Sequence, residues 1–206
     1  MLARSLIILT IVVIGSFGLS CEWLRTKNYN VDKASTGGVY RVKVDVRVVD
    51  EGDLVGHFTD QGTIQFFKGA DAITKREWNY RDNWDSTFID ANPSIEWVGD
   101  NVLRMGLSNA GQPFTDELIV SNTTTQNLKY FEVNCGRYES FEVFDIAPGG
   151  QVVLRISPKL NNVSGEIHIG YGGVTQSGRD FTGGLQQKQP DGPLKLQITI
   201  NSKDVE

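Results

Sequence analysis

Histidine and cysteine, from which many metal and catalytic sites are built, are scarce in this sequence, which has two of each among its 206 residues. Blue-copper sites combine two histidines, a cysteine and a methionine. His57, Met105, Cys135 and His168 would supply that set, but no short segment holds the cysteine, the second histidine and a methionine together. We therefore expect no metal and no cofactor.

Motifs of hydrolytic and nucleotide-binding proteins are also missing. There is no Gly-x-Ser-x-Gly nucleophile elbow, and no glycine loop follows a strand and opens a helix. Acidic residues that could bind calcium cluster in several loops, but they lack the spacing and the glycine of a calcium-binding EF-hand. The missing nucleophile–base motif favours a protein that is not an enzyme. A small hydrolase or accessory enzyme that uses acidic loop residues remains the alternative.

The sequence has no surplus of basic residues. Its 20 Lys and Arg stand against 25 Asp and Glu, which gives a formal net charge of −5. Proteins that bind nucleic acid neutralise phosphates with clustered Lys and Arg, and no such cluster is present, so we expect no nucleic-acid partner. With 39% hydrophobic and 22% charged residues, the composition is that of an ordinary globular protein.

The first residues have the pattern of an export signal. Arg4 precedes an uncharged, apolar run from Leu6 to Leu19. The run is shorter than the roughly 20 residues of a membrane span and fits the 7–15 residues or so of a signal-peptide core. We predict a signal peptide over residues 1–20 and an extracytoplasmic location.

The end of this segment, Phe17-Gly-Leu-Ser-Cys21, resembles the lipobox of bacterial lipoproteins. The resemblance implies that Cys21 becomes the lipid-modified first residue and anchors the chain in a membrane. Gly18 departs from the usual Leu, Val or Ile. Simple secretion and an uncleaved anchor therefore stay open as alternatives. In a secreted chain, a disulfide between Cys21 and Cys135 would be expected.

After the signal, the sequence reads as a polar tether and a body of strands. Residues 21–38 are weakly patterned and predict a flexible, lipid-anchored tether, and residues 39–206 predict a β-sandwich body. Apolar and charged residues alternate over Tyr40–Val49, as in a strand with one wet face. Further strands are predicted at 62–68, 94–98, 102–107, 117–121, 127–134, 139–146, 151–157, 164–172 and 194–201. No amphipathic helices separate them, which makes a parallel α/β fold improbable.

The run from Asp116 to Ile156, with its Asn122-Thr-Thr and Pro148-Gly-Gly turns, resembles immunoglobulin-like modules of extracellular proteins. The resemblance implies an all-β fold, an antiparallel immunoglobulin-like β-sandwich, and no particular activity. A boundary within the body is possible near residues 108–115.

The candidate binding site is an aromatic and acidic stretch. Trp78, Tyr80 and Trp84 lie among Asp82, Asp85 and other charged residues, where exposed aromatic rings could stack on a sugar or pack on a protein. A short helix is expected over Ala70–Trp78. The glycine-rich segment 170–184 is expected to be a long mobile hairpin or, in the alternative, a partner-binding loop that would form a second contact. The sequence thus predicts a membrane-anchored, non-enzymatic protein of the cell envelope that binds a protein or glycan partner or has a structural role.

Overall fold

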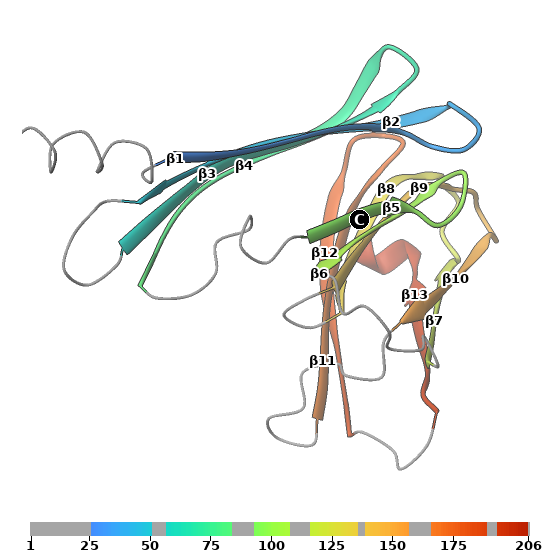
Figure 1. Cartoon of the computed structure of the whole chain (residues 1–206). Coiled ribbons are helices and arrows are strands. Elements are labelled where there is room, and N and C mark those ends of the chain that lie inside the picture. Colours follow the sequence, from blue (N-terminus) through green and yellow to red (C-terminus); the bar gives the residue numbers. More distant parts are fainter. Residues whose placement is uncertain are drawn as a thin grey trace, which may run out of the picture. The chain divides into compact units, whose positions relative to one another are not determined.

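The computed structural model describes residues 26–50, 57–83, 93–107, 116–135, 139–156, 166–188 and 193–205. This part of the chain is built of strands, with one short 3₁₀ turn, Ser202–Asp204 (Figure 1). The first strands are β1 (Thr26–Ala34), β2 (Tyr40–Asp50), β3 (His57–Lys68), β4 (Asp71–Asn83), β5 (Pro93–Trp97) and β6 (Val102–Leu107). They are followed by β7 (Asp116–Asn122), β8 (Leu128–Cys135), β9 (Glu139–Ile146), β10 (Gln151–Ile156), β11 (Glu166–Thr175), β12 (Asp180–Lys188) and β13 (Lys195–Ile200). The prediction of an all-β fold is confirmed.

The chain divides into two compact units. Unit 1 comprises Met1–Lys33, Val42–Phe66 and Thr74–Ala91, and unit 2 comprises Ala34–Arg41, Phe67–Ile73 and Asn92–Glu206. The possible boundary at 108–115 lies outside the described residues and stays a prediction. The signal peptide and Cys21 also lie outside them.

Unit 1 contains most of a four-stranded sheet with the order β1-β2-β3-β4. Alternation along β2 decides its two faces: Val42, Val44, Val46 and Val48 are buried, whereas Asp45 and its neighbours on the other face contact solvent. On β3, Ile64 and Phe66 are buried in the same alternating way. The strand predicted from Tyr40 onward is confirmed, because its apolar residues repeat with the period of a strand.

Two predictions for this sheet are wrong. Thr26–Ala34, predicted to be part of a flexible tether, forms β1, and Ala70–Trp78, expected as a helix, lies almost entirely in β4. Both segments are polar, so neither shows the clean alternation that reveals a strand. Pairing with β2 and β3 satisfies the backbone hydrogen-bonding groups of these two segments. The free energy gained by this pairing outweighs their weak local preference for other conformations.

Unit 2 contains a six-stranded sheet, β12-β11-β8-β9-β6-β5, and a three-stranded sheet, β10-β7-β13. Neighbouring strands run antiparallel except β7 and β13, which pair in parallel from Glu117↔Lys195 to Asn122↔Ile200. The hairpin predicted about residues 99–101 is confirmed, with Ile95 opposite Met105. Antiparallel sheets were therefore predicted correctly, and the parallel pair was not.

One hydrophobic cluster includes side chains from both sheets of unit 2. Leu118 and Leu196 come from the three-stranded sheet, and Phe131 and Phe141 come from the six-stranded sheet. On β9, both Val143 and Ile146 belong to the cluster, so the face that points into the core changes between them. Asp145 lies at this change with φ 55°, a left-handed conformation that Asp tolerates better than most residues.

Candidate functional site

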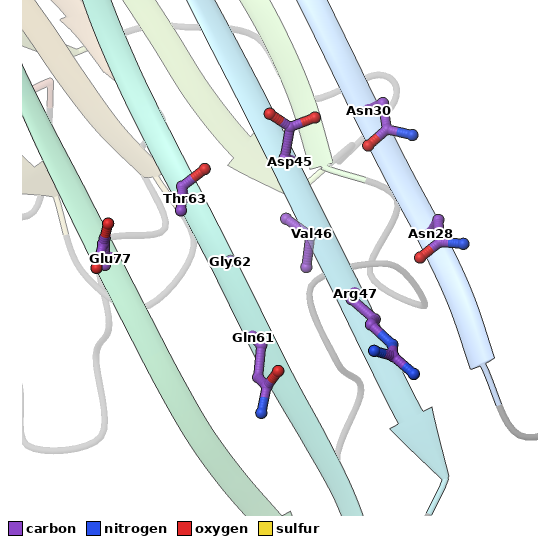
Figure 2. A pocket seen from close by; sticks show the side chains of 9 residues that line it. All are labelled: Asn28, Asn30, Asp45, Val46, Arg47, Gln61, Gly62, Thr63 and Glu77. Carbon is purple, nitrogen blue, oxygen red and sulfur yellow. The ribbon is translucent and has the colours of Figure 1, made fainter.

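A polar depression of unit 1 lies on the wet face of its four-stranded sheet and has a volume of about 560 Å³. All four strands contribute to it (Figure 2). Its lining residues are Asn28, Asn30, Asp45, Val46, Arg47, Gln61, Gly62, Thr63 and Glu77. We call this surface the polar face.

The side chains of the polar face converge because each strand alternates. Asp45 and Arg47 are exposed on β2, while the residues between and beside them point to the buried side. Gln61 and Thr63 show the same arrangement on β3, on either side of the buried Gly62. Pairing of four strands then brings these short polar rows into one surface, since neighbouring strands lie about 4.8 Å apart.

The polar face offers hydrogen-bonding groups of every kind. Amides such as that of Gln61 both donate and accept, carboxylates accept, and the Arg47 guanidinium donates. With its amide oriented to satisfy its neighbours, Asn30 donates to Asp45 Oδ1 at 3.0 Å. Glu77 forms an ion pair with Lys75 on the same strand. Charges of both signs are interspersed, so the surface has no single-sign character.

Three of the five predicted site residues follow the polar face closely in the sequence. Trp78, Tyr80 and Asp82 lie on β4 directly after Glu77, in a strand rather than an irregular loop. Trp84 and Asp85 lie outside the described residues. The proposed binding role of all five stays a prediction, as does the alternative of a hydrolase that uses acidic residues of this stretch.

Sequence reasoning missed the other residues of the polar face. A signal for Asp45 and Arg47 was present, because they occupy the charged side of the clearest strand. In the sequence alone, this pattern indicates only the solvent-facing side of a strand. Asn28 and Gln61 had no comparable signal, since only strand pairing brings them beside Arg47.

The segment 170–184, predicted as a mobile hairpin or a contact loop, is largely a hairpin. It belongs to β11 and β12, which pair from Glu166↔Lys188 to Val174↔Asp180. The turn is closed by a hydrogen bond from Thr175 N to Arg179 O of 2.9 Å, and Gly178 has φ 84°. The hairpin expected as the plain interpretation of this segment is confirmed, and its role as a contact surface stays a prediction.

A second polar centre, inside unit 2, surrounds Asp145. Its Oδ2 accepts hydrogen bonds of 2.5 Å from Tyr40 Oη and from Lys68 Nζ, and its Oδ1 accepts one of 3.0 Å from Asn127 Nδ2. Burial of the carboxyl acts to raise its pKa, but the hydrogen bonds from these three residues and the charge of Lys68 outweigh it and lower the pKa below the usual value. Burial, together with the neighbouring Asp145, raises the pKa of the Tyr40 hydroxyl.

Aromatic rings pack beside this centre. The Phe144 ring centroid lies 5.1 Å from that of Tyr40, 5.9 Å from that of Trp97 and 5.7 Å from that of Tyr130. Phe144 is fully buried. Trp97, which alternates with the buried Ile95, is half-buried. Both oxygens of the Asp145 carboxylate accept hydrogen bonds from the protein, which suits Asp145 to holding structure rather than to reacting with a ligand.

Cys135 is a buried free cysteine of the core cluster. Burial, and secondarily the charge of Glu139, raises the pKa of its thiol far above the usual value. A thiol in this environment stays protonated and unreactive. Cys135 therefore contributes to the core as a small hydrophobic side chain.

Within the described ranges, no three His, Cys, Asp or Glu side chains gather closely enough to hold a metal ion. In the same part of the chain, no helix is long and apolar enough to cross a membrane. No protein-family model, curated protein or solved structure matches the sequence.

Proposed function

We propose that this protein is a non-enzymatic binding protein of the cell envelope that recognises a glycan through the polar face. The observation that supports this proposal is the gathering of exposed amide, carboxylate and guanidinium groups from four strands on one open surface. Each sugar hydroxyl both donates and accepts a hydrogen bond, so it fits a surface that mixes both kinds of group. Planar side chains such as that of Arg47 can bond two neighbouring oxygens at once.

A glycan suits this surface better than a polyanion or an apolar peptide. A polyanion would require clustered positive charge, whereas Arg47 lies among Asp45 and Glu77. An apolar peptide would require exposed hydrophobic side chains, and Val46, the only apolar side chain in this lining, is 3% exposed.

The proposal predicts that Arg47→Ala weakens glycan binding about tenfold, because the lost charged hydrogen bonds are worth roughly 1.5 kcal/mol or more. A glycan array would first identify a binding oligosaccharide, and isothermal titration calorimetry would then compare the variants. Arg155→Ala removes an exposed arginine of unit 2 and should leave the affinity unchanged. If the full-length chain binds no glycan, or if both variants bind equally well, the proposal is wrong.

The location in the envelope rests on the lipobox resemblance. We propose that a lipid on Cys21 holds the chain at a membrane. A Cys21→Ser variant should then lose metabolic labelling by a fatty acid and move from the membrane fraction to the soluble fraction. Labelling that persists in the variant would contradict this, and membrane retention without any labelling would point to an uncleaved anchor.

We also propose that unit 2 is an immunoglobulin-like β-sandwich. If β7, β8, β10, β11 and β12 correspond to strands B, C, E, F and G, then B pairs with E in one sheet and C, F and G are neighbours in the other, as in immunoglobulin domains. β9 then takes the place of strand C′. The arrangement departs from that fold where β13, parallel to β7, occupies the position of strand A. The shared hydrophobic cluster supports the two-layer interpretation.

A further inference from the structure

The edge of the six-stranded sheet at β12 has no protection of the kind that edge strands usually carry. β12 is nine residues long, whereas the other edge strands of unit 2, β5, β10 and β13, have five or six. Between Phe181 and Gln187 it contains neither a charge nor a proline. Native proteins normally blunt a sheet edge by shortness, charge, proline or a bulge. Among the described strands, β11 is the only neighbour of β12.

The backbone groups that point to this edge follow from the hairpin. The hydrogen bond from Thr175 N to Arg179 O shows that this closing pair is bonded across the hairpin. Bonded and non-bonded pairs alternate along an antiparallel ladder, and the register runs without a shift to Glu166↔Lys188. The even-numbered residues of β12 therefore direct their N–H and C=O groups away from β11, toward the edge. They run from Asp180 through Gly184 to Lys188.

We propose that β12 pairs antiparallel with β12 of a second copy of this chain, about a two-fold axis at Gly184. This axis passes through the middle of the strand, and it places Asp180 of each copy opposite Lys188 of the other. The only two charges of β12 are thus complementary at both ends of the pair. Thr182 faces Gln186 in the same way, and these outward-facing residues are the ones whose backbone groups can bond.

The centre of the strand permits close approach. Gly183 and Gly184 are exposed and have no side chains that would separate the two edges. A contact through one nine-residue edge buries less area than a standard interface, so we expect a weak dimer that forms with increasing concentration. The pairing joins two six-stranded sheets without changing either of them, because it uses hydrogen-bonding groups that β11 does not engage.

A charge swap tests the register. Asp180→Lys and Lys188→Asp each place like charges opposite one another at both ends of the pair, and each should raise the dimer dissociation constant at least about tenfold. The double variant Asp180→Lys/Lys188→Asp restores both opposite-charge pairs and should restore the dimer. Sedimentation of the full-length chain in a density-matched detergent, at low salt and over a range of concentrations, measures each constant.

Two controls separate pairing from folding. Lys188 also lies opposite Glu166 of β11, so Lys188→Asp places two carboxylates opposite one another within a single chain and should destabilise the β11–β12 hairpin. The double variant shares that destabilisation, and only contact between copies explains its recovery. Lys203→Asp, on the 3₁₀ turn, changes the net charge equally and should not affect the dimer.

Cross-linking gives an independent measurement. Gly184→Cys lies on the proposed axis and should form a disulfide-linked dimer under mild oxidation, since the Cα–Cα separation of a bonded antiparallel pair, about 5.5 Å, suits a disulfide. Ser177→Cys, at the hairpin turn, should not. A chain that stays monomeric at every concentration, or a dimer that neither charge variant weakens, overturns the proposal.

Discussion

Phe131→Ala should lower the free energy of unfolding by about 3–5 kcal/mol, the range for removing a large aromatic side chain from a core. Phe131 is fully buried, and its ring stacks on Tyr171 and Phe181 at centroid distances of 6.0 and 6.4 Å. It belongs to the cluster that includes residues of both sheets of unit 2. The loss therefore combines the transfer of apolar surface with a cavity that the strands cannot close.

Denaturant titration followed by circular dichroism would measure this effect. Val153→Ala is a suitable control, because Val153 is 54% exposed on β10 and its truncation should change the free energy by about 0.5 kcal/mol or less. A Phe131→Ala chain as stable as the Val153→Ala control would show that the two sheets do not share a core. It would also contradict the proposed sandwich.

Asp145→Ala should destabilise the protein by about 2–4 kcal/mol at neutral pH. The carboxylate accepts hydrogen bonds from Tyr40, Lys68 and Asn127, and a hydrogen bond to a charged group contributes about 1.5–3 kcal/mol when buried, less when solvent screens it. Alanine also tolerates the φ of 55° less well than Asp does. Both effects act in the same direction.

The same carboxyl predicts a dependence on pH. Because its pKa is lower in the folded protein than in the unfolded chain, ionised Asp145 contributes stability above the unfolded value of about 3.9, and this contribution is lost as the pH falls through the folded pKa. Unfolding curves between neutral and acid pH should therefore show a smaller acid loss in Asp145→Asn than in the unchanged protein. Asparagine also tolerates positive φ, so this variant isolates the charge. An identical acid dependence in both proteins would contradict the assigned role.

Clean hydrophobic alternation made most strands predictable. Val42, Val44, Val46 and Val48 reveal β2, because alternating apolar residues show which face a strand buries. The β9 range was also predicted to the residue, although its buried residues do not alternate. β1, β4 and β12 carry polar or glycine-rich sequences. Their conformation depends on the neighbour that each strand pairs with, and that neighbour can be distant in the chain.

The candidate sites divide in the same way. The aromatic residues Trp78 and Tyr80 predicted a site on β4, but residues of β1, β2 and β3 also line the polar face. The sequence did not predict a role for Asp145, because its partners Tyr40 and Lys68 are far from it in the chain. Side chains at a distance in sequence become one site only through strand pairing.

By itself, the sequence determined the all-β class, the faces of the alternating strands, the export-signal pattern and the scarcity of metal and catalytic ligands, because composition and short-range periodicity carry this information. Only the tertiary structure decided the order of the strands, the parallel pair of β7 and β13, the gathering of Asp45, Arg47 and Gln61 on one face, and the place of β12 at the edge of its sheet among the described strands. The physical reason is that backbone hydrogen bonds between strands do not depend on side-chain identity. A strand's partner is therefore selected by the burial and packing of the whole sheet.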